Sequence, residues 1–397
     1  MPDSPDRPLR VLVLATTFPA HSGDGTPEFV LTLSSGLAAT GAEVTAVVPR
    51  VPGGVAEEVM DGVRVRRFAY FPERWEGLAD GAIMPNLRAE PWRWAEAPPL
   101  VWRLYQAAAK EIRRQRPDVV HAHWIVPAGL VASMLHRRHR LPFVITAHGA
   151  DAYTLRGKAT SRMKRAALRA AEATVPVSES IATELAPLAP VEAPIPMGVD
   201  GPRIRAEVGE RRPEPGRILF VGRLVEKKGI DVLVRALPTV PGARLVVVGD
   251  GPQRAELQAL VAATGTTERV TFLGQCPRDQ VMAELAQAAV VAIPSQVGAG
   301  GDQDGTPVVL GEAIAASVPV VVSALGGLAE HVTDGVSGRV VTPGSVDELA
   351  AALGEVLADP PGAERLAAVA LEGFNGTLDL ASVADRYRKI LDEAAGR

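Results

Sequence analysis

The residues best suited to chemistry are two cations in the segment GRLVEKKG. Arg223 and Lys228 lie five positions apart in a turn that separates an apolar strand pattern from a helical pattern. Two cations at that spacing, next to a helix N-terminus, can converge on a diphosphate group. An ordinary solvated basic turn has the same composition, so this motif alone does not decide between the two interpretations.

Two acidic residues and a glycine pair form a second set of candidates, which follows the apolar run VVAI. The loop after this run carries Asp304, and Thr306, a capping hydroxyl, precedes a proline suited to the first turn of a helix. Glu312 lies in that predicted helix, eight residues after Asp304. The pair Gly326-Gly327 follows the next apolar strand. The sequence therefore places two carboxylates and a flexible turn between two strand ends.

Five of the seven histidines lie between His121 and His148, so a metal site has to be considered. The segments HAHW and AHGAD, which contain these two histidines, each follow an apolar strand. Neither the HAHW pair nor the pair in HRRHR has a carboxylate or cysteine at a familiar zinc spacing. The HRRHR pair is typical of a solvated helix end. We therefore expect no metal site.

Apolar runs alternate with helical patterns along almost the whole chain, which predicts an α/β fold with parallel strands joined by crossover helices. Predicted strands cover residues 11–15, 43–48, 63–68, 118–122, 143–147, 174–177, 191–194, 217–221, 244–248, 270–273, 290–293 and 318–323. Predicted helices cover residues 27–39, 100–115, 127–136, 161–171, 229–237, 252–264, 278–288, 345–358, 363–372 and 380–394. Ligands bind at the strand ends of such sheets, where the candidate residues lie.

The length of 397 residues favours two domains. After residue 200 the segment GPRIRAEVGERRPEPG is rich in charge, proline and glycine, and it predicts a domain boundary. The longest irregular segment, residues 70–99, lies in the first half. All five tryptophans belong to the first third of the chain. This segment is interpreted either as a packed surface loop with its own small cluster or as an acceptor-facing or membrane-facing surface.

Composition excludes several classes of protein. With 47% apolar residues and a net charge of −4, the chain is not typical of proteins that bind nucleic acid through bulk charge. The single cysteine, Cys276, excludes an internal disulfide and fits a reducing, cytoplasmic setting. The sequence contains no GxGxxG or GxxxxGK[ST] motif, which removes the simplest interpretations as an NAD enzyme or an NTPase. The polar N-terminal segment does not resemble a signal peptide.

Membrane contact stays open as an expectation. No run approaches the roughly 20 apolar residues that span a bilayer. Residues 156–169 nevertheless carry six basic side chains, a density that suits docking on anionic lipid. A solvated helix face explains the same pattern. We therefore expect a cytoplasmic protein, with a peripheral contact at the inner face of the membrane as an alternative.

Several motifs occur in one order along nearly the whole chain: FPAHSGDGTPEF, PDVVHAHW, TAHGAD, PMGVD, VGRLVEKKGID, VVGDGP, FLGQ and PS…DGTPVVLGEAIA…PVV…GGLAE. Together they resemble the retaining glycosyltransferases of family 4, which have the GT-B fold. The resemblance implies two Rossmann-like parallel-sheet domains that face each other across a cleft. Residues 1–200 would form the acceptor-side domain and residues 201–379 the nucleotide-sugar-binding domain, with residues 380–397 as a helix that crosses back to the first.

The resemblance also assigns roles to residues. Glu312 would bind the donor ribose, and Asp304, where the family usually has Glu, would lie near the donor sugar. Arg223 and Lys228 would bind the diphosphate, and His148 would lie beside the donor sugar. Further donor contacts are implied at Gly25, Thr26, Gly251, Gly305, Thr306, Gly326 and Gly327. Acceptor-side positions are implied at Trp124, His148 and Asp151, and Met197 stands where many relatives have Asn.

The resemblance implies glycosyl transfer with retention, from a nucleotide-diphosphate sugar to an acceptor hydroxyl, without a metal ion or other cofactor. The triplet Asp302-Gln303-Asp304 resembles a metal-binding DxD element, which keeps a metal-dependent alternative open. The expected partners are the donor and a small-molecule, glycan or lipid-linked acceptor, and no nucleic acid. Three further interpretations stay open, namely a nucleotide-sugar epimerase, a glycan phosphorylase and a binding protein with a decayed site.

Overall fold

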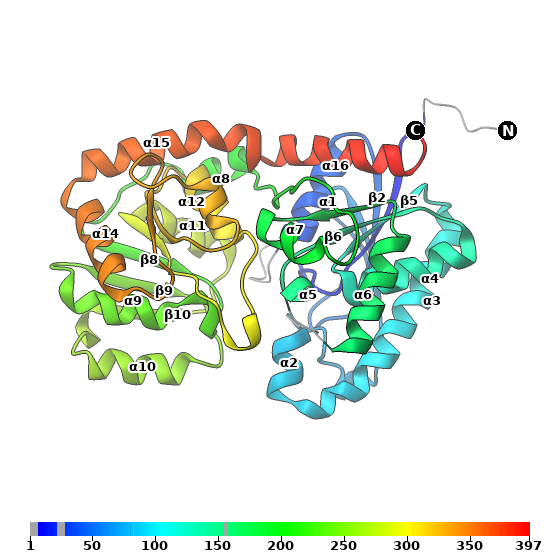
Figure 1. Ribbon diagram of the computed structural model, residues 1–397, viewed down its shortest axis with the longest axis horizontal. Coiled ribbons are helices and arrows are strands. Elements are labelled where there is room, and N and C mark those ends of the chain that lie inside the picture. Colours follow the sequence, from blue (N-terminus) through cyan, green and yellow to red (C-terminus); the bar gives the residue numbers. More distant parts are fainter. Residues whose placement is uncertain (1–6, 22–27, 82, 154–156) are drawn as a thin grey trace. The chain divides into compact units, whose positions relative to one another are not determined.

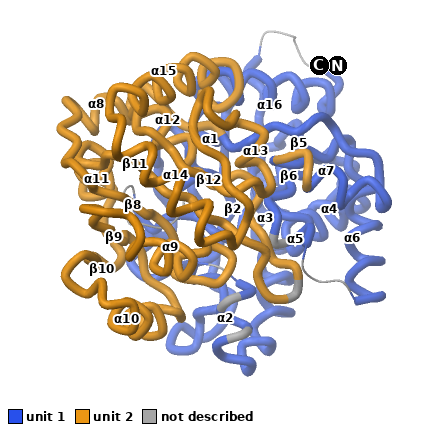
Figure 2. The backbone as a smooth tube through the Cα atoms, turned by 60° about the vertical axis from the view of Figure 1, so that its left-hand side comes forward, with its two compact units in different colours: residues 1–177, 181–197, 380–397 blue, residues 178–180, 198–379 orange. Residues whose placement is uncertain are grey.

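The computed structural model describes residues 7–21, 28–81, 83–153 and 157–397. Contacts divide the chain into two compact units, coloured separately in Figure 2. Unit 1 comprises residues 1–177, 181–197 and 380–397, and unit 2 comprises residues 178–180 and 198–379. The chain thus leaves unit 1 near residue 197 and returns to it at residue 380.

Unit 1 is built on a seven-stranded sheet in the order β3-β4-β2-β1-β5-β6-β7. Neighbouring strands are parallel, except for the antiparallel pair β3–β4. The order reverses between β1 and β5, so the loops after these two strands diverge to opposite faces of the sheet. The strands are β1 (Arg10–Leu14), β2 (Glu43–Pro49), β3 (Glu57–Met60), β4 (Val63–Phe68), β5 (Val119–His123), β6 (Phe143–Ala147) and β7 (Ala173–Pro176).

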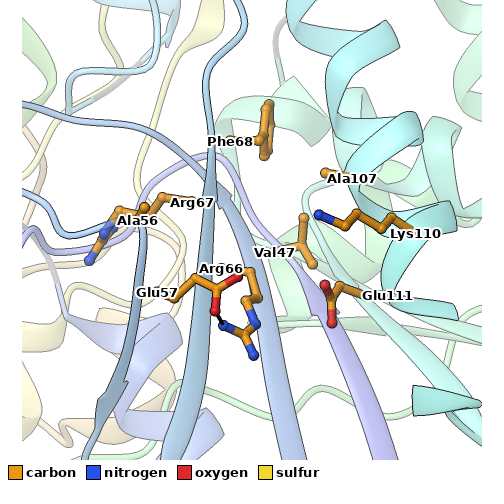
Figure 3. A pocket seen from close by; sticks show the side chains of 9 residues that line it. All are labelled: Val47, Ala56, Glu57, Arg66, Arg67, Phe68, Ala107, Lys110 and Glu111. Atoms are coloured by element: carbon orange, nitrogen blue, oxygen red, sulfur yellow. Dashed lines mark ion pairs between the residues drawn. The ribbon is translucent and has the colours of Figure 1, made fainter. Parts of the chain in front are cut away.

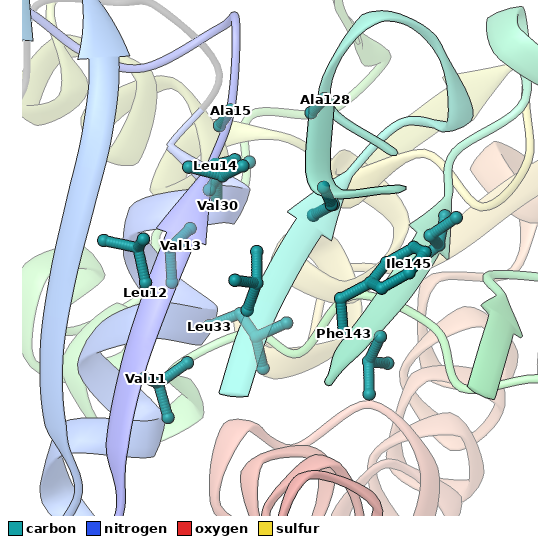
Figure 4. Packing of buried hydrophobic residues seen from close by; sticks show 14 of the residues in the cluster. Val11, Leu12, Val13, Leu14, Ala15, Val30, Leu33, Ala128, Phe143 and Ile145 are labelled. Carbon is teal, nitrogen blue, oxygen red and sulfur yellow. The ribbon is translucent and has the colours of Figure 1, made fainter. Parts of the chain in front are cut away.

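Helices cover this sheet, and the last helix of the chain is one of them. After Arg10, β1 is apolar and packs with α1 and with β6 in a single cluster (Figure 4). The helix α16 lies along α1, where Gly36 allows Leu380 and Ala384 to approach closely (Figure 1). The helices are α1 (Phe29–Ala39), α2 (Ile83–Ala89), α3 (Ala97–Gln115), α4 (Leu130–His139), α5 (Ala150–Tyr153), α6 (Lys158–Ala170), α7 (Glu179–Leu185) and α16 (Leu380–Ala394).

The segment predicted to be irregular, residues 70–99, is instead largely helical. It contains the 3₁₀ turn η1 (Glu73–Trp75), α2 and the 3₁₀ helix η2 (Pro91–Glu96). Tyr70 and Leu78 lie in a small buried cluster of its own, in agreement with the packed-loop interpretation. The buried carboxylate of Glu96 accepts hydrogen bonds from the amides of residues 77 and 78, which holds the segment together. The prediction failed because prolines divide the helical pattern into pieces too short to recognise.

Unit 2 is built on a six-stranded, fully parallel sheet in the order β10-β9-β8-β11-β12-β13. The order reverses between β8 and β11, which is the arrangement of doubly wound nucleotide-binding sheets. Side chains of β8 alternate between two buried clusters, with Ile218 and Phe220 in one and Leu219 in the other. The sheet is therefore buried on both faces, as parallel sheets generally are.

The strands of unit 2 are β8 (Arg217–Val221), β9 (Arg244–Val248), β10 (Val270–Gly274), β11 (Val290–Ile293), β12 (Val320–Ser323) and β13 (Arg339–Val341). Its helices are α8 (Gly201–Val208), α9 (Ile230–Ala236), α10 (Arg254–Ala263), α11 (Arg278–Gln287), α12 (Val308–Ala315), α13 (Leu328–His331), α14 (Val346–Ala358) and α15 (Pro360–Thr377). The predicted α/β class with two parallel sheets is confirmed. In the described part of the chain, no helix combines the length and the apolar character needed to cross a membrane.

One predicted strand was wrong, and the helix α8 was not predicted. Residues 191–194 form no strand. The charged segment after residue 200 begins with a helix, α8, because the Asp200 side chain accepts a hydrogen bond from the Arg203 amide and caps the first turn. Arg203 also pairs with Glu207 one turn later, which supports the helix through an i,i+4 ion pair.

The motif VVGDGP owes its glycines to a close approach of backbones. Gly249 has a φ of +128°, and a Cβ there would lie 2.0 Å from the carbonyl oxygen of Gly222. A Cβ at Gly251 would lie 2.4 Å from the carbonyl oxygen of Leu224. The backbone of the loop after β9 therefore packs directly against the loop that carries Arg223. The glycines of the motif make this close packing possible.

We expect Gly249→Ala to destabilise the protein by at least about 3 kcal/mol, because it combines an unfavourable φ with a collision against main chain. The expected fall in Tm is roughly 6–12 °C for a unit of this size. Gly354→Ala is the matched control, since no heavy atom lies within 4 Å of the added Cβ and the site is within α14. Its Tm should stay level or rise slightly. Equal melting curves for the two variants would contradict the close-approach argument.

Candidate functional site

The candidate residues of unit 2 gather at the point where its strand order reverses. Arg223 and Lys228 lie in the loop after β8, and Asp304 lies in the loop after β11. β8 and β11 are hydrogen-bonded neighbours in the sheet, with Val290 opposite Ile218. Loops separated by about 75 residues of sequence therefore meet at one sheet edge, the position where such sheets bind ligands.

An ion-pair cluster joins these two loops. The Lys228 ammonium lies 2.7 Å from one oxygen of Asp304, and the Lys227 ammonium lies 3.4 Å from the other. Lys227 also donates to Asp302 at 3.1 Å. Each of these four side chains is less than one-fifth exposed. The cluster is therefore largely shielded from solvent, where ion pairs are stronger than at an open surface.

Burial and charge act in opposite directions on this cluster. Burial of the Asp304 carboxyl group would raise its pKa, but the ammonium groups of Lys228 and Lys227 outweigh burial and hold the pKa below its ordinary value. Burial would likewise lower the pKa of Lys227, but the charges of Asp304 and Asp302 raise it instead. Asp304 and Lys227 are therefore both charged at neutral pH, because the charge of each residue stabilises the charged form of the other.

Arg223 differs from the two lysines. Its side chain is exposed, and among the described residues no carboxylate pairs with its guanidinium group. Burial of part of the side chain lowers its pKa, but a guanidinium group without a carboxylate partner can still turn to a ligand without breaking an internal ion pair. Arg223 is thus the more available of the two predicted phosphate-binding cations.

Glu312 lies on α12 and is held by a different cation from Asp304. Its carboxylate is 3.6 Å from a guanidinium nitrogen of Arg278, and it is 16% exposed. Arg278 in turn donates to Glu207 at 2.7 Å. The helix begins at Val308, so Pro307 and not Thr306 occupies the capping position, one residue later than predicted.

The glycine pair packs against the acidic loop. Gly326 has a φ of +52°, and a Cβ there would lie 2.7 Å from the carbonyl oxygen of Asp304. A Cβ at Gly327 would lie 1.9 Å from the Thr306 hydroxyl. The Gly327 amide donates to the carbonyl of Gly305 at 3.0 Å, so in this structure that amide is used within the site. The pair therefore lets a third strand-end loop approach the acidic loop.

The candidate residues of unit 1 lie at the ends of β5 and β6. His123 Nδ1 is 3.0 Å from His148 Nε2, and His121 Nε2 is 2.8 Å from the Thr146 hydroxyl. That hydroxyl also lies 3.3 Å from the hydroxyl of Tyr387 on α16. The rings of His121 and His123 lie 4.3 Å apart between centroids. A continuous row of polar rings thus leads from the C-terminal helix to His148.

These imidazoles are uncharged. Burial lowers the pKa of His121 to about 3. Burial and the neighbouring His121 also lower the pKa of His148 to about 3. The pKa of His123 is shifted in the same direction by burial and by its two histidine neighbours. His148 is therefore a neutral hydrogen-bonding group across the physiological range, and an imidazolium acid is not available there.

The two other acceptor-side candidates surround His148. Trp124 is partly buried, and its ring lies 4.9 Å from that of His148. Asp151 is 4% exposed, and its oxygens accept hydrogen bonds from the amides of Ile125, His148 and Gly149. In this structure the Asp151 carboxylate thus holds the loop that carries His148. Met197, at the unusual position in PMGVD, is buried in the core of unit 1.

The remaining predictions fall outside this picture. Gly25 and Thr26 lie outside the described residues. Of the six basic residues predicted for lipid docking, Arg156 is also outside them, and Lys164 is buried, donating to the Ala152 carbonyl. A pocket between β4 and α3, lined by Arg66 and Lys110 among others, contains none of the predicted site residues (Figure 3).

Sequence reasoning missed three contributors to the site: Lys227, Arg278 and His123. Lys227 stands next to a predicted residue, and the doublet in EKKG gave no indication of which lysine would be shielded. Arg278 is distant in sequence from Glu312, so only the fold brings the two together. His123 was considered only as part of a metal pair, although its contact partner, His148, was already a candidate.

Comparisons with known proteins agree over both units. Residues 23–201 match the family model Glycosyltransferase Family 4, and residues 203–372 match the model Glycosyl transferases group 1. A glycogen synthase of Mycobacterium tuberculosis is similar to this chain at 30% identity over 402 residues, which cover 95% of this chain and 92% of that protein.

Solved structures are similar in fold. Sucrose-phosphate synthase from Thermosynechococcus elongatus has a TM-score of 0.74 at 22% identity, covering 97% of this chain and 98% of that one. Anabaena HepE, solved in complex with UDP and glucose, has a TM-score of 0.71 at 19% identity, covering 97% of this chain and 100% of that one. The expected GT-B fold class is confirmed.

The histidines at the ends of β5 and β6 predict a specific loss of stability in acid. An unfolded histidine takes up a proton near pH 6.5, whereas folded His121 and His148, each with a pKa of about 3, do so only near pH 3. The stability that neutral burial supports is therefore complete above pH 6.5 and falls as the pH drops from 6.5 towards 3. At pH 5 each histidine is expected to cost about 2 kcal/mol relative to pH 7.5.

Melting curves of wild type and His121→Gln at pH 7.5 and pH 5.0 test this expectation. The variant should lose less Tm between the two pH values than wild type, because one of the protonation sites is gone. His21→Gln, at an exposed histidine, is the control and should behave as wild type. A His121→Gln protein whose Tm falls as steeply as that of wild type would refute the assignment.

Proposed function

We propose that this chain, which belongs to glycosyltransferase family 4, transfers a sugar from a nucleotide diphosphate to an acceptor hydroxyl with retention and without a metal ion. Its membership of the family makes it a glycosyltransferase. The observation that carries the finer proposal is the ion pair of Lys228 with Asp304, which lies where the strand order of unit 2 reverses, next to the loop position of Arg223. Two cations and a carboxylate at one sheet edge suit a ligand that carries both a diphosphate and sugar hydroxyls.

The cations would act on the leaving group. When the bond between the anomeric carbon and the diphosphate oxygen breaks, negative charge develops on the nucleoside diphosphate. Arg223 would turn its exposed guanidinium to the phosphates, while Lys228 is already held in place by Asp304. Charges that are in position before the reaction stabilise such a transition state without further reorganisation.

The carboxylates would act on the donor hydroxyls. We assign Glu312 to the ribose and Asp304 to the sugar. Glu312 is steadied by Arg278 but is still partly exposed, so its oxygens can accept hydrogen bonds from a ligand. The complex of Anabaena HepE with UDP and glucose supports a nucleotide sugar as the kind of donor. Asp304, one methylene shorter than the usual Glu, would alter which sugar hydroxyl is bound.

The acceptor hydroxyl would attack the anomeric carbon from the face that the diphosphate leaves. Its oxygen forms the new glycosidic bond, and its proton passes to the departing phosphate oxygen, so no separate protein base is required. Trp124 and His148 are proposed for the acceptor side of unit 1, where neutral His148 would donate or accept a hydrogen bond.

The exposed basic residues of α6 are proposed to contact anionic lipid when the acceptor is lipid-linked. Cosedimentation of the protein with anionic vesicles tests this contact.

An NMR time course with a panel of nucleotide sugars tests the reaction. Donors are first selected by thermal shift and then incubated with and without candidate acceptors. We expect a new glycoside whose anomeric coupling constant matches that of the donor. A product of inverted configuration would overturn retention. Conversion of the donor into an epimer without acceptor would instead establish the epimerase alternative.

Substitutions at the site should weaken transfer while leaving the fold intact. We expect Lys228→Ala to lower kcat on the order of 10²–10³-fold, because it removes a charge that faces the leaving group. Glu312→Ala should mainly raise KM for the donor. The matched controls are Lys389→Ala on α16 and Glu256→Ala on α10, both exposed. Full activity of folded Lys228→Ala would end the assignment.

A further inference from the structure

We propose that Lys227 is a built-in counter-cation for Asp302 and Asp304, occupying the place between them that a divalent metal ion would take in a DxD site. The inference rests on the proposed function and deepens it, because it explains how an acidic pair serves a metal-free transfer. Lys227 Nζ lies 3.1 Å from Asp302 and 3.4 Å from Asp304. These are distances at which one ammonium group bridges two carboxylates.

The charges of the cluster support this role. Lys228 lies 2.7 Å from the second oxygen of Asp304, so this carboxylate faces one ammonium group on each side. Two carboxylates are thus matched by two cations from neighbouring positions of the chain. A divalent ion in this cluster would be repelled by the two lysine charges. Among the residues that the structure describes, no three carboxylate, histidine or cysteine side chains lie close enough to hold a metal together.

Shielding from solvent makes the countercharge necessary. The side chains of Lys227 and Asp302 are each 19% exposed, and that of Asp304 is 15% exposed. A shielded carboxylate that loses its partner is costly, and at neutral pH a divalent cation added to the solution can take the partner's place. Removal of the Lys227 charge should therefore allow a cation to bind between the two carboxylates. The wild-type protein should not bind a cation there.

Lys227 and its neighbour also hold the acidic loop in position through the backbone. The Gln296 amide donates to the Lys227 carbonyl at 2.9 Å, and the Ala299 amide donates to the Glu226 carboxylate at 2.7 Å. The Gln296 side chain donates to the Glu226 carbonyl at 2.9 Å. Residues 296 and 299 of the loop after β11 are therefore fastened to residues 226 and 227. Lys227 is a positioning residue that sets where Asp304 stands relative to Lys228.

The test compares Lys227→Met, which keeps the length and removes the charge, with Lys227→Arg, which keeps the charge. Mn²⁺ is the probe, and its binding is followed by electron paramagnetic resonance in the absence of any sugar. We expect no tight Mn²⁺ site in wild type or in Lys227→Arg, and one site in Lys227→Met. That site should disappear when Asp302→Asn is added to Lys227→Met.

Activity supplies the second readout. Wild-type transfer should be unchanged by EDTA or by Mn²⁺. Lys227→Met should lose about tenfold or more in kcat/KM, and Mn²⁺ should restore part of the loss, whereas Lys227→Arg should need no metal. Restoration by a metal ion is not expected of a residue that only supports the fold. Lys227→Gln is made in parallel in case the methionine variant does not fold.

The outcomes separate the two proposals. Binding of Mn²⁺ to wild type that Asp302→Asn abolishes overturns the role of Lys227, whatever the variants do. A folded Lys227→Met or Lys227→Gln protein that gains no Mn²⁺ site overturns it as well. The Mn²⁺ measurement needs no sugar, so the role of Lys227 can be tested even if transfer is never observed. Transfer by wild type in EDTA supports the metal-free reaction even if the Lys227 variants bind no metal.

Discussion

The salt-bridged contact between the loop after β8 and the loop after β11 is the constraint on which the rest of unit 2 depends. It exists because β8 and β11 are neighbours in the sheet, although two strands and three α-helices separate them in the chain. The other features keep this contact in register. The glycines of VVGDGP support the loop after β8 from one side, and Gly326-Gly327 lets a third loop approach from the other.

In unit 1 the main constraint is the burial of polar histidine rings in the core. His121 and His123 have no exposed surface, yet each has one ring nitrogen with a hydrogen-bonding partner. The partners come from the next strand and, through Thr146, from Tyr387 on the last helix. Such an arrangement tolerates neutral imidazoles and penalises charged ones. It leaves His148 fixed in orientation by His123 on one side and by the packed rings of Trp124 and Phe29 on the other.

Sequence reasoning was accurate where apolar residues recur at the period of a strand or a helix, or form a continuous run. The predicted strands at residues 63–68, 143–147 and 217–221 have the observed bounds of β4, β6 and β8, and the predicted helix at 380–394 has those of α16. It missed α8, because charge, proline and glycine dominate the composition of this segment, whereas the Asp200 side chain caps the first turn of a helix. Short edge strands such as β3 and β13 were missed because three or four residues carry too little periodicity.

The candidate site was only partly predictable for a related reason. Lys228, Asp304 and Glu312 stand in motifs, and their spacing along the chain suggested the chemistry. The roles of Lys227 and Arg278 depend on which side chains become shielded and on which distant carboxylates they meet. Such pairings follow from strand order and burial, which no local pattern encodes. The same holds for Asp151, whose oxygens proved to be engaged by three backbone amides.

The return of residues 380–397 to unit 1 has a consequence for biosynthesis. A ribosome completes all of unit 2 before it makes the helix that covers Gly36 on α1 and supplies Tyr387 to the histidine row. The face of α1 that packs against α16 therefore stays uncovered in nascent unit 1 while about 180 further residues are synthesised. Unit 2, contiguous apart from three residues, is not delayed in this way. The unit encoded first is consequently the one whose folding is finished last.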